Sequence, residues 1–128
     1  MTHLTTLDEL RNQILILAQI EAHRTPFVSC YLNLERGRDS ATAVMERRAG
    51  LLRRVLRGTD LEDFEGSIAT IKGYIDQELL PEAKGLAFFA RSGLEQAFHM
   101  PLQFAVPLPD RLMVYPTPNI YHLIELKD

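Results

Sequence analysis

Five arginines lie within one short stretch, MERRAGLLRRVLRG at residues 45–58. A guanidinium group is a planar fork that binds two phosphate oxygens at once, so a cluster of arginines favours a polyanionic ligand. The protein as a whole is acidic, with a net charge of -3, whereas residues 36–57 contain seven arginines and two acids. This asymmetry predicts that one face meets an anionic partner, the alternative being an ordinary solvated helix face. The predicted phosphate-binding residues are Arg36, Arg38, Arg47, Arg53, Arg54 and Arg57.

No other set of side chains offers comparable chemistry. Cys30 stands among apolar neighbours in a strand pattern, which favours inert packing over a nucleophile. His3, His23, His99 and His122 lack the spacing of metal ligands, and no phosphate-binding glycine loop or nucleophile elbow occurs. We therefore predict no catalysis by this chain alone, no cofactor and no metal.

The lone cysteine and the N-terminal sequence bear on the compartment. One cysteine cannot form an internal disulfide, which fits a reducing environment. The N-terminal residues do not resemble a secretory signal, and no apolar run is long enough to span a bilayer. The sequence predicts a cytoplasmic protein that does not associate with membranes.

The arginines belong to one of several elements that the hydrophobic pattern predicts. Helices are expected at about 7–21, 40–57 and 61–80, and a further helix begins near residue 120. Strands are expected within 25–35, 85–91, 94–100 and 111–116. Thr6 with Glu9 and Thr59 with Glu62 have capping-box spacing, and Asp39 or Ser40 is expected to cap the arginine-rich helix. Asn119 is expected to cap the last helix.

The arginine-rich helix has an apolar stripe that is expected to face the core. The stripe contains Ala41, Val44, Met45, Leu51, Leu52, Val55 and Leu56. Arg48 falls inside it, where it is expected to be ion-paired or to reach toward the edge.

This order of elements predicts an α/β fold. We expect a sandwich of about four mixed or antiparallel strands flanked by helices, with a helix hairpin between the first and second strands. At 128 residues the chain suits one domain, 1–128.

The order of motifs resembles the N-terminal domain of the archaeo-eukaryotic class 1 peptide-chain release factors, in particular their bacterial branch. The segments that carry the resemblance are TPFVSCYLNLE, SIATIKGYIDQELLPEAKGLAFFA, FAVPLPDRLMVY and NIYHLIEL. The resemblance implies that residues 1–128 are one domain of a longer chain with further domains downstream. It also implies that the helix hairpin faces the ribosome and contacts ribosomal RNA or tRNA.

The chain departs from that family at its functional motifs. The Asn-Ile-Lys-Ser motif of the hairpin is absent, and RVLR stands in its place. The family's second decoding motif is Tyr-x-Cys-x-x-x-Phe. In the matching positions, here called the decoding-like motif, Tyr115 matches, Thr117 replaces the cysteine and Tyr121 replaces the phenylalanine. The peptide-releasing Gly-Gly-Gln is absent from the chain. The resemblance thus implies an RNA-facing domain in termination, rescue or stalling, without standard stop-codon reading and without release chemistry of its own.

A protein-interaction or structural module is the alternative. A chain that kept the fold and lost RNA binding would use a protein partner or a homodimer. Its expected contact is an exposed apolar patch near Phe98, Met100 and Phe104.

Overall fold

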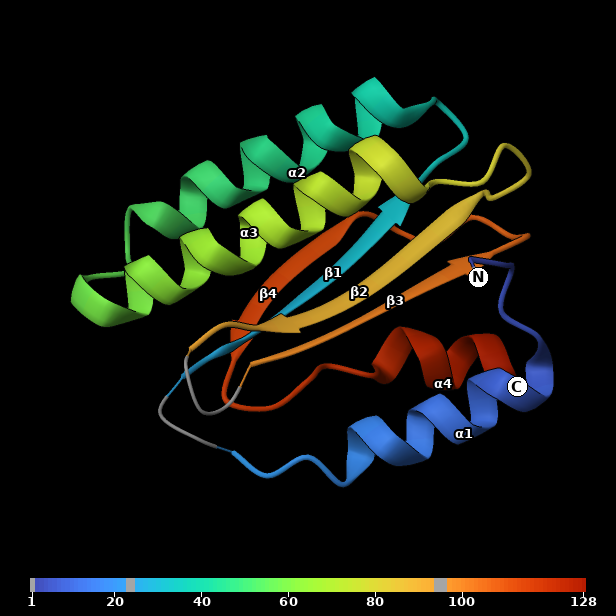
Figure 1. The fold of residues 1–128 in the computed structure, drawn as a ribbon, viewed down its shortest axis with the longest axis horizontal. Coiled ribbons are helices and arrows are strands. Elements are labelled where there is room, and N and C mark those ends of the chain that lie inside the picture. The colour runs from blue at the N-terminus through green and yellow to red at the C-terminus, as the bar shows by residue number, and fades with distance from the viewer. Residues whose placement is uncertain (1, 23–24, 94–96) are drawn as a thin grey trace.

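The computed structural model describes residues 2–22, 25–93 and 97–128. One sheet lies between two helical layers, with α2 and α3 on one face and α1 and α4 on the other (Figure 1). This confirms the predicted α/β fold with flanking helices and a hairpin between the first two strands. In chain order the elements are α1 Leu7–Ala18, β1 Phe27–Asn33, α2 Arg38–Arg53, α3 Gly58–Glu78, β2 Gly85–Arg91, β3 Phe98–Phe104, β4 Arg111–Tyr115 and α4 Tyr121–Lys127.

The sheet is antiparallel throughout, in the order β3-β2-β1-β4. The two central strands are buried along almost their whole length because helices cover both faces. In β1, Val28, Cys30 and Leu32 face the α2–α3 hairpin, while Phe27 and Tyr31 face α1 and α4. The sequence indicated one strongly apolar face for this strand, and the structure buries the other face as well.

Two helix starts differ from the predicted caps. Gly37, with a φ of 95°, is the N-cap of α2, and neither Asp39 nor Ser40 takes that place. The sharp turn out of β1 needs this left-handed conformation, which glycine adopts without a steric penalty. Arg57 is the N-cap of α3, so the capping box expected from Thr59 and Glu62 is wrong. The capping box of Thr6 and Glu9 at the start of α1 is confirmed.

Two other helix boundaries are also corrected. The first helix ends at Ala18 rather than near Glu21. The N-cap of α4 is Ile120 rather than Asn119, although the Asn119 side chain accepts a hydrogen bond from the Tyr121 N–H at 3.2 Å.

The third strand lies further along the chain than expected. Residues 94–96 of the predicted strand lie outside the described residues, and β3 continues to Phe104 through Pro101. Proline is tolerated there because β3 is an edge strand. The shift buries Phe104 against α1, and Phe98 and Met100 pack on the same core. The expected exposed apolar patch at these three residues is therefore wrong.

The predicted stripe of α2 is confirmed except at Leu51 and Val55, because Ala41 and Met45 are buried and Val44, Leu52 and Leu56 pack against the core. Ala41, Met45 and Ala49 face the core, whereas Leu51 is 60% exposed and Val55 is 73% exposed. Arg48 is exposed as well, which removes the expected conflict with the core.

Candidate nucleic-acid interface

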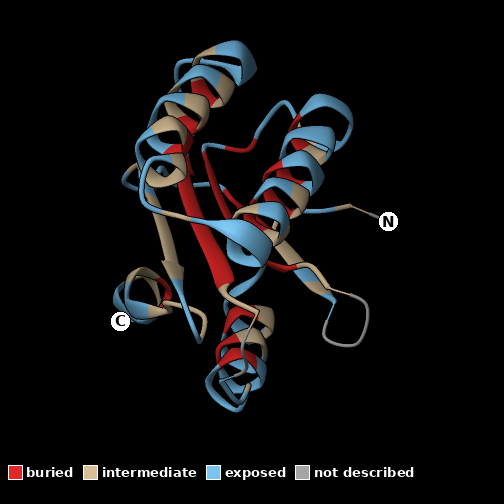
Figure 2. Ribbon diagram, turned by 90° about the vertical axis from the view of Figure 1, so that its left-hand side faces the viewer, coloured by how far each residue is buried: buried red, intermediate tan, exposed pale blue. Residues whose placement is uncertain are grey.

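The α2–α3 hairpin places its turn, residues 54–57, beyond one end of the sheet (Figure 1). The Ser92 hydroxyl, just after β2, donates a hydrogen bond of 2.6 Å to the Asp63 carbonyl in the first turns of α3. This contact fixes the start of α3 over the end of the sheet, so the turn before it projects outward. Figure 2 views the molecule from this end and shows both hairpin helices exposed on their outer sides and buried toward the sheet.

Arg53 joins the two helices of the hairpin. Its Nε donates to the Oε1 and Oε2 atoms of Glu65 on α3 at 2.9 and 3.0 Å, and its Nη1 lies 3.4 Å from Oε2 of Glu46 on α2. Partial burial opposes the charge of Arg53, but the hydrogen bonds and attraction of Glu65 and Glu46 outweigh burial and raise its pKa. The Arg53 guanidinium is therefore already paired with carboxylates and is not available to a ligand.

Arg57 is also used inside the hairpin. Its Nη1 donates to the backbone carbonyls of Arg54 and Leu56, both at 2.9 Å. These carbonyls follow the last turn of α2 and lack partners within that helix. Arg57 thus stabilises the hairpin turn, although its side chain stays exposed.

Three arginines of the hairpin remain available to a ligand. In the described part of the chain, the exposed side chains of Arg47, Arg48 and Arg54 take part in no hydrogen bond or ion pair. Arg48 was not among the predicted binding residues because its helical position indicated the apolar stripe. The structure thus brings Arg47 and Arg54 together with Arg48 on the outer side of α2.

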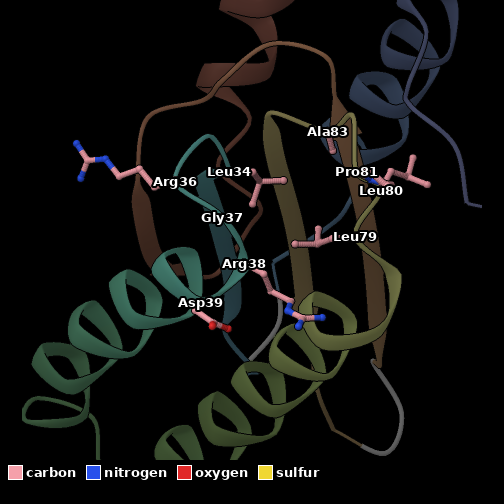
Figure 3. Close-up of a pocket in the computed structure, with 9 residues that line it drawn as sticks. All are labelled: Leu34, Arg36, Gly37, Arg38, Asp39, Leu79, Leu80, Pro81 and Ala83. Atoms are coloured by element: carbon pink, nitrogen blue, oxygen red, sulfur yellow. The ribbon is translucent and has the colours of Figure 1, made fainter.

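Arg36 and Arg38 lie at the opposite end of the hairpin. They stand at the start of α2, a 16-residue helix that is about 24 Å long. Arg38 donates to the Asp76 carbonyl of α3 at 3.1 Å. Both line a pocket of about 470 Å³, from which Arg36 points away (Figure 3). The six predicted arginines therefore do not form one surface.

The three residues of the decoding-like motif, Tyr115, Thr117 and Tyr121, also lie apart from one another. Tyr115, 66% exposed, ends β4 opposite Phe27, at the same end of the sheet as the hairpin turn. Thr117 is half-buried, and Tyr121 begins α4 on the face opposite the hairpin.

The loop that separates them is held to β1 by Asn119. The Asn119 N–H donates to the Ser29 hydroxyl at 2.9 Å, and the Tyr31 hydroxyl donates to the Asn119 carbonyl. Burial raises the pKa of Tyr31, so this hydroxyl stays protonated and able to donate. Asn119 therefore keeps Tyr121 away from the hairpin side.

Glu46 and Glu65 are the residues of the site that sequence reasoning missed. The sequence did contain a signal for the Arg53–Glu65 pair. Both residues are six positions from Thr59, and residues at equal distances from a hairpin turn lie at the same level of the two helices. Leu51 and Val55 were assigned to the core because of their helical spacing, and no local signal distinguishes their face from that of Ala49.

Cys30, the candidate nucleophile, is buried, and His23 lies outside the described residues. Burial, with a smaller effect of the Asp110 charge, raises the pKa of the Cys30 thiol to about 12, so the thiol is neutral near pH 7. Among the residues that the structure describes, no three His, Cys, Asp or Glu side chains are placed to hold a metal ion. The described helices include none with the length and apolar character needed to cross a membrane.

Comparison with solved structures shows a release-factor-like fold. A structure titled only as an archaeal protein matches with a TM-score of 0.75 and 11% identity, over 98% of this chain and 37% of that one. The archaeal translation termination factor aRF1 matches with a TM-score of 0.72 and 12% identity, over 96% of this chain and 35% of that one. The chain thus spans little more than a third of either structure. No protein-family profile and no curated protein sequence matches.

Proposed function

We propose that this chain is the RNA-facing, N-terminal domain of a bacterial release-factor-like protein that acts on the ribosome in termination, rescue or stalling. The main support for the proposal is the projecting hairpin, on which Arg47, Arg48 and Arg54 are exposed and have no acidic partner in the described part of the chain. Its similarity in fold to a translation termination factor supports the ribosome as the partner. The protein would work in the cytoplasm, where ribosomes are.

The expected contact is with the phosphates of ribosomal RNA or tRNA. Proteins bind folded RNA largely through its shape and backbone, so an arginine surface suffices without base-specific contacts. The absence of Asn-Ile-Lys-Ser and the separation of Tyr115 from Tyr121 both argue against standard stop-codon reading. Any peptide release would depend on further domains of the protein, because this chain has no Gly-Gly-Gln.

Co-sedimentation with ribosomes across a salt series tests the proposal. The variant Arg47→Glu/Arg48→Glu/Arg54→Glu removes the available charges and leaves the Arg53 and Arg57 contacts in place. We expect it to lose most of the binding at low salt. The slope of log affinity against log salt should fall by about 2 to 3, because each lost phosphate contact removes about 0.7 to 0.9.

The matched control is Arg11→Glu/Lys84→Glu/Arg111→Glu, which changes the net charge equally at exposed positions outside the hairpin. It should bind nearly as well as the wild type. Equal losses in the two variants would mean that net charge, not the hairpin, drives binding. No binding of the wild type at low salt would reject the proposal and favour the protein-interaction alternative.

A further inference from the structure

We infer that Leu51 and Val55 form an aliphatic contact for an unstacked nucleotide of RNA, between arginines that hold the flanking phosphates. The inference rests on the proposed RNA-binding function and assigns to the hairpin a component of binding that is not electrostatic. The α2 patch, as we use the term, consists of Arg47, Arg48, Leu51, Arg54 and Val55.

Leu51 lies at the centre of the α2 patch. Residues three or four positions apart are neighbours on a helix surface. Arg47, Arg48 and Arg54 each lie three or four positions from Leu51, and so does Val55. The helix ends at Arg53, but the Arg54 backbone keeps a right-handed helical conformation and the Val55 N–H still donates to the Leu52 carbonyl. The patch is therefore one continuous surface.

The aliphatic pair of the α2 patch is well exposed. Val55, at 73%, is the most exposed large hydrophobic residue in the described part of the chain, and Leu51, at 60%, is the next most exposed aliphatic one. A single exposed leucine is common on protein surfaces. Two neighbouring aliphatic side chains beside three arginines, however, form a surface that is both apolar and positively charged. Such a surface complements a ligand that presents negative charge and an apolar face together.

An unstacked nucleotide combines negative charge with an apolar face. Its phosphates carry the charge, and its base offers a flat apolar face that single-stranded loops and bulges leave accessible. A stable protein interface buries roughly 800 Å² on each partner and is rich in aromatic residues. Two aliphatic side chains supply too little apolar area for such an interface. Their size is instead suited to contact with one base.

Contacts inside the hairpin fix the turn next to the patch before any ligand arrives. The bond from Arg53 to Glu65 joins α2 to α3, and Arg57 closes the turn. A preformed surface loses little conformational entropy on binding. The aliphatic pair is therefore available to contribute affinity that added salt does not screen.

The test uses two RNA hairpins that differ by one bulged nucleotide, with ribosomes as a second ligand. The variant Leu51→Gln/Val55→Thr keeps the size of both side chains and all of the arginines. We expect about tenfold weaker binding to ribosomes and to the bulged RNA at every salt concentration, with an unchanged salt slope. The wild type should prefer the bulged RNA to the paired one, and the variant should lose that preference.

The matched control is Leu15→Gln/Ile16→Thr, which makes closely similar changes at exposed positions of α1, on the opposite face of the sheet. It should bind as the wild type does. Thermal unfolding should be the same for the α2 variant and the wild type, since both altered side chains are exposed.

The outcomes separate the inference from the proposed function. If the α2 variant binds ribosomes and bulged RNA like the wild type, the inference is overturned and the arginine contact stands. If the wild type binds neither ligand at low salt, the proposed function fails and the inference fails with it. If light scattering shows a dimer that the α2 variant dissociates, the patch is occupied by a second copy of the chain and the inference is overturned.

Discussion

The helical layers on the two faces of the sheet are held in different ways. The hairpin layer consists of two long helices, of 16 and 21 residues, joined at an exposed position by Arg53 between Glu46 and Glu65. The other layer consists of two short helices, of 12 and 7 residues. Polar contacts fix these short helices at their starts, through the Thr6 capping box and through Asn119.

This difference indicates separate roles for the two layers. Long helices with a continuous apolar stripe bury more area against the sheet and can extend past it. Short helices are marginal by themselves and depend on the sheet for their position. The hairpin is therefore suited to reach a ligand, and the opposite layer anchors both ends of the described chain.

The largest expected effect on stability comes from truncating a buried side chain on each face of the sheet. Phe64 in α3 and Leu123 in α4 are both fully buried. Phe64→Ala should lower the free energy of unfolding by about 3 to 5 kcal/mol, because it leaves a cavity under a long helix. Leu123→Ala should lower it by about 2 kcal/mol and should speed hydrogen exchange in α4 alone, because a seven-residue helix can detach locally.

Urea unfolding and residue-resolved hydrogen exchange measure both quantities. Equal losses of stability in the two variants, with faster exchange across the whole chain in both, would mean that the layers unfold as one unit. The proposed difference in stability between the hairpin and the layer of short helices would then be wrong.

A smaller effect is expected from the charged link in the hairpin. A double-mutant cycle of Arg53→Gln and Glu65→Gln should give a coupling of about 0.5 kcal/mol, because the side chains are about one-third and one-half exposed and water screens the pair. The same cycle with Arg54→Gln in place of Arg53→Gln should give no coupling, since Arg54 is exposed and has no such partner. Thermal or urea unfolding of each variant gives these values.

The smallest effect concerns the cap of α1. A hydrogen bond from the Thr6 backbone, with contributions from His3 and the Thr6 hydroxyl, lowers the pKa of Glu9 from 4.5 to about 2. A lowered pKa in the folded state means that Glu9 contributes stability above pH 4.5, which is lost as the pH falls toward 2. Thr6→Ala keeps the backbone donor and removes only the hydroxyl, so it should raise the pKa of Glu9 by a small part of the shift. Titration followed by NMR checks this change, and a return of the pKa to 4.5 would contradict the main role of the backbone hydrogen bond.

Local patterns in the sequence were enough to predict most of the elements. The 3.6-residue spacing of apolar residues predicted the hairpin, and the apolar run at 85–91 predicted the central strand β2. The Thr6 and Glu9 cap was predictable because its partners are three residues apart. The third strand was misplaced because Pro101 is an unfavourable strand residue unless the strand lies at an edge, and the edge is set by strand order.

The candidate site was predicted only as a region. The sequence indicated that the hairpin carries the basic charge, but it assigned Arg53 and Arg57 to the ligand and left out Arg48. Which arginines are available depends on Glu65, which lies on another helix, and on the packing that buries Ala49 and leaves Leu51 exposed.

The sequence by itself determined the helices, the strands, the hairpin and its charge, because these follow from spacing and composition over short distances. Only the tertiary structure decided which face of α2 is outside, which arginines lack carboxylate partners, and how far Tyr121 stands from the hairpin. Those properties arise from contacts between residues far apart in the chain, such as Asn119 with Ser29, and packing against the sheet selects among the arrangements that the local pattern allows.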